Sequence, residues 1–179
     1  QNALAVGCAA QALGIKPEVI RASLETFTNV PHRLEYIASI DGVDYINDSK
    51  ATNINSTWYA LESMRKPTIL ILGGTDKGND YNDLMALVKE KVVGLIYMTT
   101  DSAKLHRSFD SVIPRHEEVT SMRDAIAAAR QMAQAGDTVL LSPACASFDL
   151  FTCYEDRGDQ FRAEVLAIAQ QQPDTDRSL

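Results

Sequence analysis

Two patterns alternate along the sequence from residue 68 onward, and this alternation limits the possible folds more than any other feature. Short apolar runs predict buried strands, at residues 68–72, 92–98, 118–120 and 138–141. Amphipathic stretches predict helices, at residues 82–91, 102–109, 122–135 and 160–171. Strands that alternate with helices favour right-handed crossovers, which place helices on both faces of a mainly parallel sheet. We therefore expect an α/β domain.

A β-hairpin is predicted before this alternation. Extended patterns at residues 34–40 and 43–46 flank the dipeptide Asp41-Gly42, which is a strong turn signal between alternating apolar residues. A helix predicted at residues 55–64 then leads into the first strand of the alternation. The expected fold is therefore a Rossmann-like, mainly parallel sheet with helices on both faces and an N-terminal β-hairpin.

The first residues predict a separate helical hairpin. Residues 1–12 and 17–27 have helical spacing, and Thr28, Asn29 and Pro31 indicate a linker. We expect one domain to end with residues 1–29 and another to occupy residues 30–179. Because the sequence begins QNALAV without Met, we expect it to be a piece of a longer protein.

The composition excludes several classes of protein. The 179 residues hold 17 Lys and Arg against 24 Asp and Glu, and the net charge of −7 argues against a nucleic-acid-binding surface. No apolar window reaches the roughly 18 residues of a membrane span. Three cysteines without a CxxC pair indicate a reducing compartment, and we expect a cytoplasmic location and no metal site in this chain.

Three loops follow predicted strands at what would be the carboxyl edge of the sheet, where open α/β sheets bind ligands. The first loop, residues 46–53, contains Asp48, Lys50 and Thr52 before a predicted helix. Helix capping explains some of its polar residues, but it does not explain Lys50, a cation near the positive end of a helix. A ligand site is the preferred interpretation.

The second and third loops carry weaker signals. Residues 73–80 combine glycines with Lys77 but match neither GxxxxGK[ST] nor GxGxxG, so an ordinary polar turn is about as probable as an anion site. Residues 141–149 contain Ser147, whose hydroxyl could meet a ligand carboxylate. Cys145 has no obvious histidine partner, and we expect a buried thiol rather than a nucleophile.

Other charged residues allow two interpretations. Arg33 could reach a phosphate held between two domains, or could lock a hinge as a salt bridge. Arg157 could join the other cations at the edge of the sheet, or could form a surface salt bridge. His106 and His116 belong to a surface helix and a Pro-containing loop, and we expect both to be solvated.

Taken together, these segments resemble the Mur ligases. The resemblance covers roughly residues 29–162 and rests on an ordered set of motifs: HRLE at 32–35, NDSKATN at 47–53, LGG at 72–74 with Lys77, SPACASFD at 142–149 and EDRG at 155–158. SPACASFD looks particular to the branch of the family that adds D-glutamate. Residues 1–29 are similar to the last helices of the central ATPase domain of this family.

The resemblance implies a reaction and a site. In the family, ATP phosphorylates the carboxylate of a UDP-N-acetylmuramoyl-L-alanine precursor, and the amine of D-glutamate attacks the acyl phosphate. The residues that match the D-glutamate pocket are Lys50, Thr52, Lys77, Ser147 and, through their backbones, Phe148 and Tyr154. Those that match the ATP site are Asn2, Arg33, Asp48 and Lys50.

The resemblance also implies what else the reaction needs. The phosphate-binding loop and the Mg²⁺ ligands belong to the central ATPase domain, so we assign no catalytic residue and expect the fragment alone to be inactive. We expect the domain to pack on the central ATPase domain. Two alternatives stay open: another Mur or folylpolyglutamate-type amide ligase, and a Rossmann-like binding module without catalysis.

Overall fold

The structure is a computed structural model that describes the backbone of residues 2–26 and 30–171, with side chains from residue 4. The chain divides into two compact units, Gln1–Val30 and Pro31–Leu179, and each is described by itself. The predicted nucleotide contact of the Asn2 side chain and the predicted linker at residues 28–29 lie outside the described residues.

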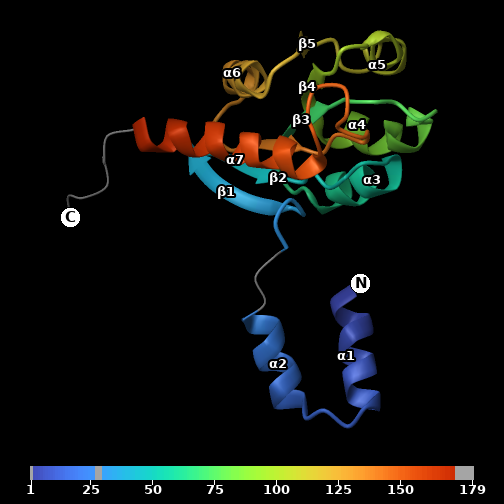
Figure 1. Cartoon of the computed structure of the whole chain (residues 1–179), viewed down its shortest axis with the longest axis vertical. Coiled ribbons are helices and arrows are strands. Elements are labelled where there is room, and N and C mark those ends of the chain that lie inside the picture. The colour runs from blue at the N-terminus through green and yellow to red at the C-terminus, as the bar shows by residue number, and fades with distance from the viewer. Residues whose placement is uncertain (1, 27–29, 172–179) are drawn as a thin grey trace. The chain divides into compact units, whose positions relative to one another are not determined.

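The first unit is a helical hairpin, as the sequence predicts. The helices α1 (Asn2–Ala12) and α2 (Pro17–Glu25) lie side by side (Figure 1). Gly14 has a φ of +75°, and the N–H of Ile15 donates to the carbonyl of Ala10, so α1 ends in a left-handed glycine turn. Pro17 begins α2 because its fixed φ suits the first helical position.

The second unit contains a six-stranded sheet in the order β1-β2-β6-β3-β4-β5. Only the pair β1–β2 is antiparallel, and the other pairs are parallel. This agrees with the predicted Rossmann-like fold. The strands are β1 (Glu35–Ile40), β2 (Val43–Asn47), β3 (Thr68–Leu72), β4 (Val92–Met98), β5 (His116–Val119) and β6 (Thr138–Leu141).

Helices cover both faces of this sheet. α3 (Ile54–Ser63), a 3₁₀ turn η1 (Tyr81–Leu84), α4 (Met85–Lys91) and α5 (Ala103–Phe109) pack on one face; α6 (Met122–Met132) and α7 (Tyr154–Gln171) pack on the other. Side chains of β3 alternate between the layers, with Leu70 facing the first and Ile71 the second. From β2 the chain runs through β3 and β4 to β5, and it then returns to β6. Because the crossovers are right-handed, α6, on the return, lies on the opposite face from the helices of the outward run.

The turn between β1 and β2 confirms the hairpin prediction. Asp41 has a φ of +53° and Gly42 a φ of +78°, and Ile40 pairs with Val43 across the turn. Two successive positive φ values define a type I′ turn, whose twist matches that of the flanking strands. Glycine takes this conformation without strain, and aspartate tolerates it better than most residues.

Several predicted boundaries were wrong. α7 begins at Tyr154 rather than at residue 160, β5 begins at His116 rather than at residue 118, and α6 ends at Met132 rather than at residue 135. The early start of α7 follows from local chemistry: Asp156 accepts hydrogen bonds from the N–H and hydroxyl of Thr152, and acidic side chains in a first turn complement the helix dipole. Within the described ranges, no helix has the length and apolar character that crossing a lipid bilayer requires.

Candidate functional site

The three loops singled out in the sequence meet at one edge of the sheet. They follow β2, β6 and β3, which are neighbours in the strand order. The N–H of Asp48 donates to the carbonyl of Leu141, and the N–H of Gly73 donates to that of Pro143. Thr75 also pairs with Ala146 in an isolated antiparallel bridge. The loops therefore form one connected surface at the carboxyl ends of three adjacent strands, as the sequence predicts.

Asp48 is a buried carboxylate held by two donors. Its side-chain oxygens accept hydrogen bonds from the N–H of Leu34 at 3.2 Å and from the hydroxyl of Ser142 at 2.9 Å. Burial raises the pKa of Asp48 to about 6, against the opposing effects of these two hydrogen bonds and of the positive charge of Arg33. The carboxylate is therefore ionised at neutral pH and titrates only slightly below it.

Lys50 is positioned by an aromatic ring from another element. Its ammonium donates to the hydroxyl of Tyr154 at 2.9 Å and lies 4.8 Å from the centre of the same ring. Tyr154 is the first residue of α7, and its carbonyl accepts from the hydroxyl of Ser49 at 2.7 Å. α7 thus holds two side chains of the first loop, those of Ser49 and Lys50.

The capping interpretation of the first loop is correct for one residue. Asn53 is the N-cap of α3, and its side chain accepts from the N–H of Ser56 at 2.9 Å. Capping leaves Lys50 and the half-buried Thr52 unexplained, because neither side chain caps this helix. Both residues stay candidates for ligand contact.

The glycines of the second loop serve packing. Gly73 has a φ of +124° and Gly74 a φ of +133°, which side chains rarely tolerate. A Cβ on Gly73 would lie 2.7 Å from the carbonyl oxygen of Met98, and one on Gly74 would lie 2.2 Å from that of Ala146. The sequence suggested glycines for close approach to an anion, whereas here they allow close approach of neighbouring backbone. Lys77 is exposed at the tip of this loop.

The third loop mixes buried and exposed residues. Ser147 is 2% exposed, while the next residue, Phe148, is 68% exposed. Cys145 is buried, and its Sγ atom lies 3.3 Å from the hydroxyl oxygen of Tyr81. Burial raises the pKa of the Cys145 thiol. A protonated buried thiol is a poor nucleophile, which confirms the structural interpretation of this cysteine.

The interpretation of Arg157 as a surface salt bridge was wrong. The side chain is 1% exposed and lies among backbone carbonyls of the first and third loops. It donates to the hydroxyl of Ser49 at 3.0 Å, to the carbonyl of Ser49 at 2.9 Å and to the carbonyl of Cys145 at 3.3 Å. Burial lowers the pKa of Arg157 to about 10, so it remains charged at neutral pH. Arg157 therefore fastens the first loop to the third.

Arg33 lies in a strained segment. His32 and Leu34 both have positive φ values, of +63° and +42°, which are uncommon for residues with side chains. His32 is buried, and a Cβ on Gly158 would lie 2.2 Å from its Nδ1 atom. Arg33 itself is exposed between these two residues. His32 thus packs closely on α7, while the same backbone conformation exposes the side chain of Arg33.

Sequence reasoning missed the residue that ties this segment together. Asn47, at the end of β2, is fully buried, and its Nδ2 atom lies 3.1 Å from three acceptors, on His32, Glu35 and Gly158. A polar amide directly after the apolar residues Tyr45 and Ile46 is the signal that could have identified it, since a buried amide requires partners.

His106 and His116 were also misassigned. Both were expected to be solvated, but their side chains are 28% and 24% exposed and contact each other, Tyr97 and Asp110. This cluster joins α5 to β5.

Two curated relatives that are similar to this chain have the same name. UDP-N-acetylmuramoylalanine–D-glutamate ligase from Porphyromonas gingivalis is 65% identical over 167 residues, which cover 93% of this chain and 37% of the relative. The protein of the same name from Bacteroides fragilis is 54% identical and covers 92% of this chain and 37% of its own length. The chain therefore spans little more than a third of the relatives that it matches.

Solved structures show the same fold at low sequence identity. MurF from Acinetobacter baumannii has a TM-score of 0.64 at 15% identity, with 95% of this chain and 37% of that chain covered. UDP-N-acetylmuramate-alanine ligase MurC from Thermotoga maritima has a TM-score of 0.63 at 14% identity, with 93% and 37% covered. A sequence model described as Mur ligase, glutamate ligase domain, matches residues 32–145, more than half of the chain. The chain therefore belongs to the Mur ligase family and contains its glutamate ligase domain.

Proposed function

We propose that this chain is the D-glutamate-binding part of an ATP-dependent ligase that joins D-glutamate to UDP-N-acetylmuramoyl-L-alanine in peptidoglycan synthesis. The observation that carries the proposal is the 65% identity with a named D-glutamate ligase over 93% of the chain. The convergence of the three loops supports it, because it gathers cationic and polar groups at the carboxyl edge of the sheet.

D-Glutamate needs cations and donors for its two carboxylates. Lys50 and Lys77 would supply the positive charges, and the hydroxyls of Thr52 and Ser147 would supply hydrogen bonds. The backbones of Phe148 and Tyr154 complete the proposed pocket. Tyr154 has a further part in it, because its hydroxyl accepts from the Lys50 ammonium and so orients that cation.

Four residues are the proposed nucleotide contacts. Arg33 is exposed and would bind ATP phosphates, for which a guanidinium is well suited. Lys50 would contribute a second cation, and Asn2 would lie near the adenine. Asp48 would accept from a ribose hydroxyl, although both its oxygens already accept from Leu34 and Ser142, so such a contact would add to these two.

In the proposed reaction, the L-alanine carboxylate of the precursor attacks the γ-phosphorus of ATP and releases ADP. The amine of D-glutamate then attacks the acyl phosphate, and the amide forms as phosphate and a proton leave. This chain's part is to hold the amine in reach of the acyl carbon. Because the proposed reaction uses ATP, we propose a cytoplasmic location, and the three free cysteines support a reducing compartment.

Mg²⁺ would accompany ATP, but the first two loops offer poor ligands for it. Asp48 uses both carboxylate oxygens on Leu34 and Ser142, and Asp76 uses both on the N–H groups of Gly78 and Asn79 and on Lys104. These hydrogen bonds compete with Mg²⁺ for the two carboxylates, because Mg²⁺ requires hard oxygen ligands in near-ideal octahedral geometry. We therefore assign no step of the reaction to Mg²⁺ held by these loops, and propose that its ligands belong to the ATPase domain.

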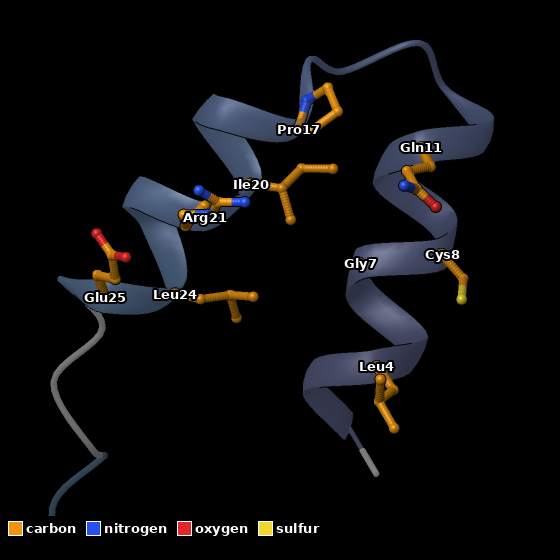
Figure 2. Close-up of a pocket in the computed structure, with 9 residues that line it drawn as sticks. All are labelled: Leu4, Gly7, Cys8, Gln11, Pro17, Ile20, Arg21, Leu24 and Glu25. Carbon is orange, nitrogen blue, oxygen red and sulfur yellow. The ribbon is translucent and has the colours of Figure 1, made fainter.

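The helical hairpin would belong to that central ATPase domain. Its helices enclose a groove of about 550 Å³ lined by apolar side chains that include Leu4, Ile20 and Leu24 (Figure 2). Leu4 is 74% exposed and Leu24 48% exposed, and no residue of α2 is buried. Exposed apolar surface of this kind is usually covered by further protein. We propose that the rest of the ATPase domain covers it and that a hinge near Pro31 lets the ligase domain close.

A chimeric enzyme tests the proposal. The part of the Porphyromonas gingivalis relative that precedes the matched segment would be joined to this chain. Release of ADP and formation of the amide product would be measured with UDP-N-acetylmuramoyl-L-alanine, ATP and D-glutamate. We expect turnover that requires D-glutamate, and L-glutamate, L-alanine and a diamino acid should not replace it. The unmodified relative serves as the positive control.

Two variants test the assigned pocket. Lys77→Ala and Ser147→Ala should each raise the KM for D-glutamate about tenfold or more, as expected when a bound carboxylate loses a charged or polar partner. Lys89→Ala is the matched control, because Lys89 is exposed near the end of α4, where β4 begins, at the opposite edge of the sheet. Turnover with another amino acid but not D-glutamate would indicate a different amide ligase. A chimera that binds D-glutamate but never consumes ATP would favour a binding module.

A further inference from the structure

A second polar cluster lies at the opposite side of the sheet from the β1–β2 hairpin. His106 and Asp110 are four residues apart and so share one face of α5, and His116 begins the edge strand β5. One ligand atom from each of these residues lies within 4.8 Å of the other two. Nδ1 of His106 is 2.8 Å from one oxygen of Asp110, and Nδ1 of His116 is 3.6 Å from the other.

One atom of this cluster has no hydrogen-bond partner. Nδ1 of His116 is buried, and no described donor or acceptor lies within hydrogen-bond distance of it. Buried polar atoms are normally paired, so an orphan of this kind calls for an explanation. The His116 ring is stacked on Tyr97, with 5.4 Å between ring centres, and this stacking directs the unpaired nitrogen toward Asp110.

Surrounding side chains already orient the other two residues. The second ring nitrogen of His106, Nε2, bonds to the carboxylate of Glu118, and the hydroxyl of Tyr97 donates to Asp110 at 3.1 Å. A histidine that bonds a carboxylate through one nitrogen and presents the other inward is the arrangement found around protein-bound zinc. Glu118 follows His116 by two residues, so both side chains leave β5 on the same face.

We propose that His106, Asp110 and His116 bind a divalent transition-metal ion of the zinc class, with Glu118 as the partner that orients His106. Two imidazole nitrogens and a carboxylate oxygen are preferred zinc ligands, and water would complete a tetrahedron. In such a tetrahedron neighbouring ligand atoms are about 3.3–3.5 Å apart. The distances of 2.8 Å and 3.6 Å run to different oxygens of Asp110, and one ligand atom from each residue lies within 4.8 Å of the other two. An ion would therefore draw the three side chains together by up to about an ångström.

The metal would have a structural effect. It would connect α5 to the edge strand β5 and replace the hydrogen bonds of an ion-pair cluster by coordinate bonds. Because an ion that binds only the folded protein stabilises it, Zn²⁺ at a hundredfold excess over its Kd should raise the Tm of this unit by about 5–10 °C. This site is separate from the three-loop surface and does not depend on the proposed ligase function.

The experiment uses the untagged chain with Co²⁺ and Zn²⁺ as probes. We expect one equivalent of Co²⁺ to produce the visible absorption of a tetrahedral complex without a thiolate charge-transfer band, and Zn²⁺ to displace it. Calorimetry should give one Zn²⁺ per chain. A Cys8→Ser/Cys153→Ser variant should behave in the same way, since both thiols are at least partly exposed and neither belongs to the cluster.

Three variants decide the assignment. His116→Gln should abolish the Co²⁺ spectrum and the rise in Tm, and Glu118→Gln should weaken Zn²⁺ binding about 10- to 100-fold. Glu117→Gln is the matched control, because its side chain leaves the opposite face of β5 and is exposed. If the unmodified chain gives no tetrahedral Co²⁺ spectrum, or if His116→Gln binds Zn²⁺ as tightly as the unmodified chain, the cluster is an ion-pair network only and the proposal is wrong. The measurement on the unmodified chain holds even if a variant fails to fold.

Discussion

The ammonium of Lys50 lies 2.9 Å from the hydroxyl of Tyr154 and 4.8 Å from the centre of its ring, although the two residues are 104 positions apart in the sequence. Both contacts favour one position of the cation, through a hydrogen bond and through attraction to the aromatic face. Tyr154 is thereby a positioning residue for the cation that we assign to ligand binding.

Removal of the tyrosine hydroxyl should weaken substrate capture. In the chimeric enzyme, Tyr154→Phe should raise the KM for D-glutamate roughly fivefold, equivalent to ~1 kcal/mol, and Tyr154→Ala should raise it further because the ring contact is lost as well. Steady-state kinetics measure both values. Tyr59→Phe is the control, since Tyr59 is an exposed residue of α3. An unchanged KM in Tyr154→Ala would contradict the positioning role.

Loss of the buried guanidinium should destabilise the domain. In Arg157→Met the carbonyls of Ser49 and Cys145 lose their donor, and we expect a decrease of about 2–4 kcal/mol in the free energy of unfolding. Urea unfolding, followed by the fluorescence of the single tryptophan, Trp58, measures it. Arg123→Met, whose side chain is 81% exposed, should change stability by less than about 0.5 kcal/mol. Equal stabilities of the two variants would refute this account of Arg157.

Stability should depend on pH through Asp48. Its pKa is about 6 in the folded protein against an ordinary value of 3.8, so between these two values the folded state binds more protons than the unfolded state. The contribution of Asp48 to the free energy of unfolding, about 2–3 kcal/mol, is therefore fully present below pH ~4. It is lost as the pH rises to ~6. Asp48→Asn should lack this dependence. Unfolding curves of both proteins at pH 4, 5, 6 and 7 test it, and parallel pH profiles would show that Asp48 does not titrate in this range.

The contact between α7 and His32 should not tolerate a methyl group. Gly158→Ala would place a Cβ 2.2 Å from Nδ1 of His32, and we expect a destabilisation of about 1–3 kcal/mol despite the better helix propensity of alanine. Gly7→Ala is the matched control: it is also a helix-interior glycine, and a Cβ there meets nothing within 4 Å. Thermal unfolding compares them.

A double variant separates steric conflict from other causes. If the His32 ring is the obstacle, Gly158→Ala should cost little in a His32→Gly background, so the two changes should be strongly non-additive. Glycine also removes the strain of the positive φ at position 32. Additive effects would show that the loss of stability arises elsewhere.

The sequence by itself determined the elements whose causes are local. The apolar run of β3 predicts a strand buried on both faces, and all five of its residues are buried. Asp41-Gly42 predicts the hairpin turn, and both residues adopt the required positive φ. Alternation of strands and helices determined the parallel sheet and the edge at which the three loops meet. Periodicity and turn chemistry act over a few residues, so they can be seen without any tertiary contact.

Only the tertiary structure decided the role of residues whose partners are distant in sequence. Gly158 looks like a helix breaker, yet it lies within α7 because no larger residue fits against His32. Arg157 looks like a surface cation, yet its donors face carbonyls that the folding of two loops brings together. His106 and His116 each look solvated, and they form a cluster only when α5 packs beside β5. Burial and hydrogen bonding at these positions depend on long-range packing, which no local pattern contains.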